Sequence, residues 1–537
     1  MRGRVETSHW DVSTPGLRPR LADAPGGGAF VCARCDAGAF VCAAVTNRPS
    51  GGATLRRLHS ALPVSELSAA PVRPLDRTPL DKKKVLAWAF YDFGNSAFTT
   101  LVVTFIYSTY FAKTMAPTEV EGTALWSRGI TVTALLVALL SPLTGAMADR
   151  GGFRKRFLLL TTLAVIVPTA LLYGFGSDQA LAALVVFVVA NTMFELSGTF
   201  YNAFLPTIAS EDSIGRVSGY GWGFGYIGGL LCMAIALVGF VQPDVPWFGL
   251  SKDGGENIRA TNVLVAAWMA VFCAPLFFVL PEQKATHAKM PMGQMVRESF
   301  AQLGDTFQHL KRYRQTVRFL VARLFFNDAL TTIFSFGGIY AATVFNFTFT
   351  EIMYFGLALN VSAGLGGFLF GFIDDKVGGK TTVVVSLIGL TAAAALAIAA
   401  GTAATDWLGN ALISVANSAK MLLGGETLIP STDVNAGKAV LWVAGIVIGL
   451  FAGPNQSASR SLLGRFVPPG KTNEFFGFFN FSGKATSFLG PLLLGLITGA
   501  THSQRAGVSI TVLFFVVGLV LMLRVDEKEG IAVAKTG

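Results

Sequence analysis

Apolar stretches long enough to cross a lipid bilayer recur along the chain from Val85 onward. A hydrocarbon layer about 30 Å thick requires about 20 apolar residues in a helix, and backbone polar groups in lipid need partners within their own segment. Twelve stretches have this length: 86–112, 128–148, 157–176, 180–206, 217–241, 260–280, 317–345, 351–373, 381–401, 437–459, 474–499 and 507–524. The pattern therefore predicts an all-α integral membrane protein with twelve transmembrane helices.

Lysine and arginine gather at one set of the predicted helix ends. These ends carry about 22 bases, whereas the opposite ends carry about 7. Basic loops stay in the cytoplasm, so this bias predicts that both termini are cytoplasmic.

The longest predicted cytoplasmic connection, residues 282–316, divides the twelve helices into two groups of six. We expect one six-helix bundle over 85–281, a second over 317–525, and a cytoplasmic tail over 526–537. Apolar residues recur at helical spacing within the connection at Met295, Val296, Phe300, Leu303, Phe307 and Leu310. This spacing indicates an amphipathic helix on the inner leaflet, and a solvated linker is the alternative.

Residues 1–84 differ from the rest of the chain. They are rich in Arg, Pro, Gly and Ala, and they lack an apolar run of membrane length or a helical period. We interpret them as a disordered extension or an over-long gene model, with an organelle transit peptide as a further alternative. Cys32, Cys35 and Cys42 have a spacing that can bind metal, but no fourth Cys or His completes a site.

Composition agrees with the apolar pattern. The chain of 537 residues is 52% hydrophobic and 14% charged, with a mean hydropathy of +0.55 and a net charge of +10. A soluble protein of this size carries about 25% charged residues. The low charge excludes a nucleic-acid-binding protein or a disulfide scaffold. Of the basic residues, 13 lie in residues 1–84 together with 7 acids, so the net charge does not indicate an anionic partner.

Two segments at equivalent places in the two halves share a pattern. GAMADRGGFRKR (145–156) follows the second predicted helix, and GFIDDKVGGK (371–380) follows the eighth. Each has Gly, acid, base, glycine and base in the same order, as in a parallel repeat of two six-helix units. The shared order involves Gly145, Asp149, Arg150, Gly152 and Arg154 in the first segment, and Asp375 and Lys376 in the second.

The first segment resembles the loop signature of the major facilitator superfamily. This resemblance implies two six-helix bundles around a central cavity. It also implies that Asp149 holds a helix N-terminus or a base of the opposite bundle in one conformation, and that release of this contact helps the cavity to switch sides. The alternative is that the bases only fix the topology.

A finer resemblance comes from three further segments. WAFYDFGNSAF (88–98), FYNAFLPTIA (200–209) with GRVSGYGWGFGYIGG (215–229), and QSASRSLLGRFVPPGKTNEFFGFFNFSGKATSFLGP (456–491) are similar to the vacuole-effluxer family of this superfamily. The best-known members release amino acids from the fungal vacuole during autophagy. The resemblance spans about residues 82–527, and the 402–436 loop matches nothing.

Few ionisable residues lie inside the predicted spans, and each costs several kcal/mol there unless it is paired or functional. Asp92 and Asp328 occupy similar places in the first helices of the two halves, where each can bind a substrate ammonium or a proton. Asp92 can instead bond within its own bundle, and Asp328 can neutralise Arg323. Glu195 is the favoured proton site, with helix packing through Ser197 or Asn191 as the alternative.

Lys484 is the deep cation of the C-terminal half. It can bind a substrate carboxylate, or it can extend toward the cytoplasmic face near Glu474. Arg460 is expected to act as a gate or topology residue. Further candidate ligands are neutral polar side chains, any of which can serve as interhelical contacts instead: Tyr91, Asn95, Tyr201, Asn202, Asn327, Asn455 and Gln456.

The sequence therefore predicts a secondary transporter that works by alternating access, rather than an enzyme. We expect export of a small zwitterionic solute, such as an amino acid, with proton coupling as an open question. The expected protein is monomeric, spans a bacterial inner membrane, contacts its solute and the lipid bilayer, and needs no cofactor, metal or nucleic acid. The alternatives are a permease for a drug, sugar or peptide, a membrane sensor, and a membrane-embedded enzyme.

Overall fold

The computed structural model describes residues 19–23, 29–34, 40–45, 80–282, 291–309, 311–423 and 435–536. The chain forms two compact units, Met1–Leu75 and Asp76–Gly537.

The first unit contains a small antiparallel sheet. Its strands are β1 (Pro19–Asp23), β2 (Ala29–Arg34) and β3 (Phe40–Val45), in the order β1-β2-β3. These strands differ from the disordered extension expected over 1–84, because short runs such as AFVCAR and FVCAAV pair along their backbones. Cys32 stands opposite Cys42 in this register, and Cys35 lies outside the described residues.

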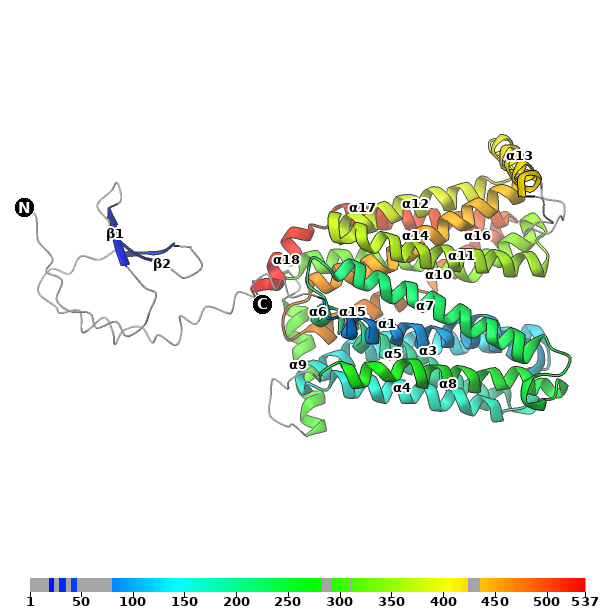
Figure 1. Cartoon of the computed structure of the whole chain (residues 1–537), viewed down its shortest axis with the longest axis horizontal. Coiled ribbons are helices and arrows are strands. Elements are labelled where there is room, and N and C mark those ends of the chain that lie inside the picture. Colours follow the sequence, from blue (N-terminus) through cyan, green and yellow to red (C-terminus); the bar gives the residue numbers. More distant parts are fainter. Residues whose placement is uncertain are drawn as a thin grey trace, which may run out of the picture. The chain divides into compact units, whose positions relative to one another are not determined.

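The second unit is helical and begins with the N-terminal half. Its longer helices run along one common direction in Figure 1. The elements of this half are α1 (Lys82–Ala97), η2 (Phe98–Phe105), α2 (Tyr107–Tyr110), η3 (Phe111–Met115), α3 (Glu119–Gly151), α4 (Arg154–Leu171), η4 (Leu172–Gly174), η5 (Ser177–Gln179), α5 (Ala180–Asn202), α6 (Leu205–Ile208), α7 (Ile214–Ala236), η6 (Leu237–Val241), η7 (Trp247–Gly249), η8 (Asp253–Gly255) and α8 (Glu256–Val279).

A connecting helix and the C-terminal half follow. Their elements are α9 (Met292–Gln308), α10 (Arg314–Phe345), α11 (Phe349–Val377), α12 (Gly379–Ala399), α13 (Asp406–Leu423), α14 (Ala436–Phe466), α15 (Thr472–Lys484), α16 (Leu489–Thr501), α17 (Gln504–Leu523) and α18 (Glu527–Thr536). Separate clusters of buried apolar side chains hold the N-terminal half, around Trp88 and Phe187, and the C-terminal half, around Phe319 and Phe476.

Ten helices in the described part of the chain are long and apolar enough to cross a bilayer. The other two predicted spans, 86–112 and 474–499, are broken into consecutive helical segments. In the first, the β-branched run TTLVVT within η2 takes a π-helical conformation, and Thr100 donates its hydroxyl to the Ser96 carbonyl at 2.9 Å. In the second, the chain breaks between α15 and α16, and Pro491 occupies the first turn of α16, where its missing N–H needs no partner.

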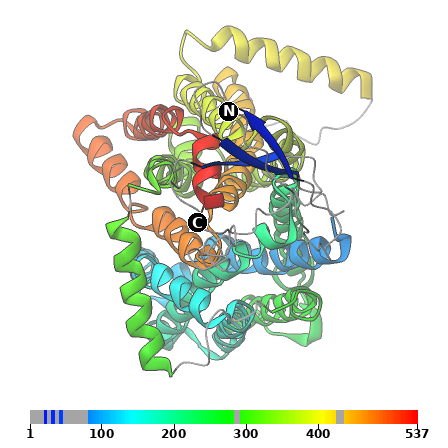
Figure 2. The same cartoon turned by 90° about the vertical axis from the view of Figure 1, so that its left-hand side faces the viewer.

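Two helices lie across the direction of the spanning helices. In Figure 2, which looks along the bundle, α9 and α13 both run in the plane of the view. The predicted amphipathic helix of the 282–316 connection is present as α9, whose Met295 and Ser299 are buried against the protein while Phe300 is exposed. The 402–436 segment, which the sequence predicts as a loop, contains α13, which packs Leu408 and Leu412 against the C-terminal half.

Candidate functional site

The first repeated segment fastens the two halves through Asp149. This side chain stands at the end of α3 and is buried. Its Oδ1 accepts from the Asn473 backbone N–H at 3.1 Å and from Asn473 Nδ2 at 2.7 Å, and its Oδ2 accepts from the Glu474 N–H at 2.8 Å. These donors belong to the first turn of α15, where a carboxylate satisfies free N–H groups and faces the positive end of the helix dipole.

Glycine makes this contact possible. A Cβ at Gly145 would lie 2.3 Å from the Asn473 carbonyl oxygen, so only glycine lets α3 approach α15 so closely. Gly152 adopts a φ of +63° and ends α3 in the left-handed region that favours glycine. Arg154 begins α4, is buried, and lies over the ring of Phe204 at 5.1 Å.

The second repeated segment makes the corresponding contact. Asp375, at the end of α11, accepts through Oδ1 from the Gly215 N–H at 2.8 Å and from the Arg216 N–H at 3.2 Å, in the first turn of α7. Its Oδ2 lies 3.2 Å from Arg216 Nε. Gly378 has a φ of +91°, and Lys376 is exposed. We call the Asp149 and Asp375 contacts the two latches, because each joins a helix of one half to the first turn of a helix in the other.

A buried ion pair that sequence reasoning missed supports the second latch. Asp374 accepts from Arg465 Nη1 at 2.7 Å and from the Ser461 hydroxyl, and Arg465 also lies 3.7 Å from Glu527. Glu527 in turn accepts from the Gly379 N–H at 3.0 Å, which begins α12. The double acid at 374–375 was the available signal, but only its second member was selected.

Helix α9 joins both halves beside the first latch. Glu298 lies 2.7 Å from Arg150 of α3, and one turn later Gln302 donates to Glu474 of α15 at 2.5 Å. Lys471 lies 3.3 Å from Asp305, and this hydrogen bond holds the pKa of the Asp305 carboxyl below its ordinary value. Arg150 therefore contacts the connecting helix.

Deeper in the spans, Arg460 of α14 ties the C-terminal half to three helices of the N-terminal half. Its Nη1 lies 3.1 Å from Asp92 Oδ2 and 3.2 Å from Asn202 Oδ1. Its Nε and Nη2 donate to the hydroxyl and the carbonyl of Ser218 at 2.9 and 2.6 Å. The guanidinium also lies 4.7 Å from the ring of Trp88. We call this the arginine tie.

A second acid–base pair crosses between the halves. Lys484 Nζ of α15 lies 2.7 Å from Glu195 Oε1 of α5, and the side chains are 33% and 20% exposed. Asn480, one turn before Lys484, donates to the Glu195 carbonyl at 2.7 Å and to the Thr199 hydroxyl at 2.9 Å. The alternative that Lys484 extends toward Glu474 is wrong, because Glu195 is its partner. Asn480 was not selected from the sequence.

Asp328 and its neighbours form contacts within the C-terminal half. Asp328 Oδ2 accepts from the Gly490 N–H at 3.1 Å, in the first turn of α16, and Oδ1 is buried without a partner among the described residues. Arg323 instead donates to the Phe479 carbonyl at 2.7 Å and lies over the Phe479 ring. The alternative that Asp328 neutralises Arg323 is therefore wrong. Asn327 donates to the Gly483 carbonyl at 2.9 Å and accepts from Gln456 at 3.3 Å.

Tyr91 and Asn95 of α1 are both buried. Tyr91 is fully buried within the N-terminal half, where its hydroxyl bonds to Thr162 at 2.7 Å and its ring stacks on Tyr201. Tyr91 is thus a packing residue in this conformation. Asn95 is buried, and its Oδ1 has no hydrogen-bond partner in the described part of the chain.

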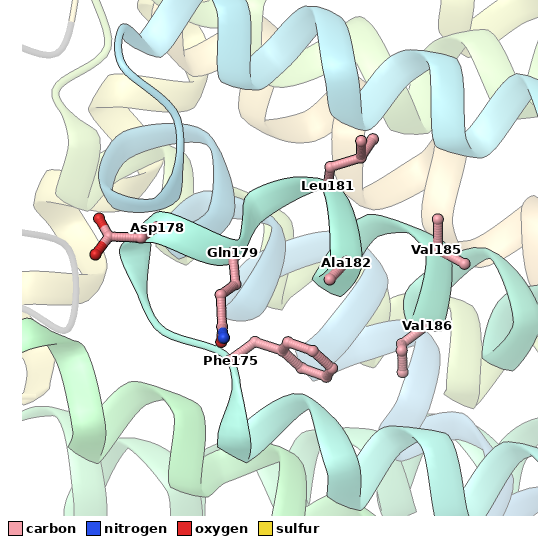
Figure 3. Close-up of a pocket in the computed structure, with 7 residues that line it drawn as sticks. All are labelled: Phe175, Asp178, Gln179, Leu181, Ala182, Val185 and Val186. Carbon is pink, nitrogen blue, oxygen red and sulfur yellow. The ribbon is translucent and has the colours of Figure 1, made fainter.

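Two surface hollows in the described part of the chain lie away from these polar groups. One hollow of about 650 Å³ lies at the turn between α4 and α5. Figure 3 shows the residues that line it: Phe175, Asp178, Gln179, Leu181, Ala182, Val185 and Val186. Leu181 and Val185 are exposed on the side of the spanning helix α5, as expected for residues that face lipid. None of the predicted site residues lines this hollow. The described residues also contain no group of His, Cys, Asp or Glu that could hold a metal ion.

Comparisons with known proteins give a consistent result. The family model described as "Vacuole effluxer Atg22 like" matches residues 109–409 and 436–535. The MFS-type transporter YxiO of Bacillus subtilis is 25% identical over 84% of this chain and 97% of its own length. Autophagy-related protein 22 of Kluyveromyces lactis is 23% identical over 70% of this chain and 74% of its own length.

Solved structures show the same fold at low identity. The proton:xylose symporter XylE has a TM-score of 0.59 at 12% identity, over 83% of this chain and 96% of that one. A bacterial homologue of the iron transporter ferroportin in an outward-facing state has a TM-score of 0.57 at 12% identity, over 83% of this chain and 99% of that one. XylE is described as a major facilitator superfamily protein, so the helical unit has the major facilitator fold.

Proposed function

Because the chain belongs to the vacuole effluxer family of the major facilitator superfamily, whose members are multi-pass membrane transporters and not enzymes, we propose that it carries a small zwitterionic solute such as an amino acid. Transport proceeds by alternating access of a site between the two halves. The direction is export, in keeping with the family's description as effluxers. The protein works as a monomer in the inner membrane of a bacterium.

One observation carries the choice of solute. Two carboxylates of the N-terminal half, Asp92 and Glu195, face two bases of the C-terminal half, Arg460 and Lys484, at distances of 3.1 and 2.7 Å. Charges of both signs are costly within spanning helices, so their presence at the meeting surface of the halves indicates a ligand with both charges. A sugar would require neutral donors and acceptors there instead.

The latches support alternating access. Both lie at the end of the bundle that carries α9 and α18 (Figure 1), which is also the end rich in Lys and Arg. We assign this end to the cytoplasm, and with it both termini. The chain then has twelve spans, if each of the two broken segments is counted as one span. The conformation described here is then closed toward the cytoplasm, and release of both latches opens it there.

Proton coupling is assigned to three carboxylates, Asp92, Glu195 and Asp328. Asp328 is suited to carry a proton because its second oxygen has no partner in the described residues and no base accompanies it, so protonation breaks no ion pair. Asp92 and Glu195 instead exchange an ion pair for a proton when the halves separate.

The experiment is uptake of radiolabelled amino acids, sugars and peptides into proteoliposomes that contain the purified full-length protein, with and without an imposed pH gradient. We expect saturable uptake of at least one amino acid and acceleration by the gradient. The variants Asp92→Asn, Glu195→Gln and Asp328→Asn are expected to lower the gradient-driven component. If only sugars or peptides enter, the zwitterion assignment is wrong. If neither the gradient nor the variants change amino-acid uptake, the coupling is wrong.

A further inference from the structure

We propose that the Glu195–Lys484 ion pair is itself the solute site and is replaced by the solute. The solute's ammonium takes the place of Lys484 on the Glu195 carboxylate, and its carboxylate takes the place of Glu195 on the Lys484 ammonium. This inference rests on the proposed function above and adds which of the two acid–base pairs binds the solute, and how.

The exposure of the two pairs distinguishes them. The Glu195 and Lys484 side chains are 20% and 33% exposed, whereas the Arg460 side chain is 4% exposed. A ligand must reach the groups that it binds, so the more accessible pair is the better candidate. Glu195 also lies seven residues before the end of α5 at Asn202, about 10 Å along the helix axis, which places it well inside the bundle.

The number of partners points the same way. Among the described residues, the Lys484 ammonium has one polar partner, the Glu195 carboxylate. Arg460 has Asp92, Asn202 and both oxygens of Ser218, and three aromatic rings surround its guanidinium. A solute that displaced the arginine tie would have to replace all of these contacts, whereas a solute at Lys484 replaces a single one.

A glycine close to Glu195 is loosely packed. Gly198 follows one turn after Glu195 on α5, and a Cβ at Gly198 would meet nothing nearer than Asn480 Nδ2 at 3.6 Å and Asn202 Nδ2 at 4.0 Å. Most helical glycines at the meeting surfaces of this fold have a neighbour within 3 Å of the same point, as Gly145 has. The packing at Gly198 is therefore looser than at those tight contacts, and the nearest atoms are the amide nitrogens of Asn480 and Asn202.

Charge balance then defines the solute class. A zwitterion gives each of the two protein charges a new counter-charge, so no charge is left unpaired between the halves. An amine without a carboxylate would leave Lys484 without a partner, and a carboxylic acid without an amine would leave Glu195 with Arg323 as its remaining basic neighbour. The pair thereby selects for solutes with both charges, and the solute keeps the two halves bridged while it is bound.

The test is a thermal-shift measurement on the purified full-length protein in detergent. The probes are the proteinogenic amino acids, the corresponding amino amides, which lack the carboxylate, and the corresponding desamino acids, which lack the ammonium. We expect at least one amino acid to raise the Tm. Its amide and its desamino analogue are each expected to bind at least about tenfold more weakly than the amino acid.

Variants of the pair provide the second part of the test. Glu195→Gln and Lys484→Met are expected to lose the shift that the amino acid causes, and the exchange E195K/K484E is expected to restore part of it. Gly198→Val adds apolar bulk beside the Asn480 and Asn202 amides, and it is expected to weaken binding while the unliganded Tm stays near that of the wild type. The matched control is D244N/K252M, which removes an exposed ion pair with a separation of 3.7 Å and should leave binding unchanged.

The outcomes separate this inference from the proposed function. If the wild type binds an amino acid and both single variants bind it equally well, the inference is wrong and the proposed function stands. If the amino amide binds the wild type as tightly as the amino acid does, the inference is also wrong and the proposed function stands. If the pair variants do not fold, two measurements still test the inference. They are the analogue series on the wild type and amino-acid binding by the Gly198→Val variant. If no amino acid binds the wild type, the inference and the proposed function both fail.

Discussion

At the residue scale, single glycines decide how closely the halves approach. Gly145→Ala places a methyl group 2.3 Å from the Asn473 carbonyl oxygen, so α3 and α15 must separate and the first latch must lengthen. In an isolated helix the same change would stabilise by about 1 kcal/mol. We therefore expect Gly145→Ala to lower the Tm and to increase access of thiol reagents to the cytoplasmic end of the bundle.

A matched helical glycine serves as the control for this prediction. Gly495 lies within α16, and a Cβ there would meet no atom within 4 Å. Gly495→Ala should leave the Tm unchanged or raise it slightly. A fall in Tm of the same size in both variants would contradict the role given to the α3–α15 contact.

The element scale concerns α9, which bridges the two sides of the first latch. Glu298 and Gln302 lie one helical turn apart and contact Arg150 and Glu474 on opposite halves. Partly exposed pairs of this kind contribute about 0.5–1 kcal/mol each. We expect E298A/Q302A to shift the equilibrium about five- to thirtyfold toward the conformation that is open to the cytoplasm, measured from distances between spin labels on the cytoplasmic ends of the halves.

An exposed residue of the same helix is the control. Arg297→Gln changes a side chain of α9 that is exposed to solvent, and the distance distribution should match that of the wild type. An unchanged distribution in E298A/Q302A would show that α9 follows the halves without stabilising their contact.

Elements differed in how well their sequence patterns predicted them. The prediction of spanning helices from the long apolar runs of α3, α5, α7 and α14 is confirmed, because a single backbone segment in lipid satisfies its polar groups only as a helix. The breaks at η2 and between α15 and α16 were missed, because neighbouring helices and side chains such as Asp328 satisfy the freed backbone groups. Helix α13 was missed because its apolar run is too short for a span.

At the scale of the whole molecule, the assigned orientation makes its own prediction. Lys376 follows the second latch and Ser251 lies in the connection between α7 and α8, and both are exposed. In a background without native cysteines, we expect Ser251→Cys to react with an impermeant maleimide on intact cells. Lys376→Cys is expected to react only after permeabilisation. The reverse pattern would place both termini outside and invert the direction of closure.

The sequence by itself determined the membrane environment, the division into two halves, the repeated Gly–acid–base segments and the family. These features depend on composition and local order, which are constrained by the cost of polar groups in lipid. It also selected Asp92, Asn202, Glu195, Lys484 and Arg460 as polar residues worth testing. Each of them takes part in a contact between the halves.

Only the tertiary structure decided which of these residues meet. Asp92 and Arg460 are 368 positions apart in the chain, and no periodicity connects them. Tyr91 looked like a ligand by helix position, but its hydroxyl bonds to Thr162 inside the N-terminal half. Asp328 binds the first turn of α16 with one oxygen, and its other oxygen has no partner among the described residues. Helix packing rotates each side chain toward a particular neighbour, so the partner of a buried charge follows from how the helices pack, which the linear sequence does not contain.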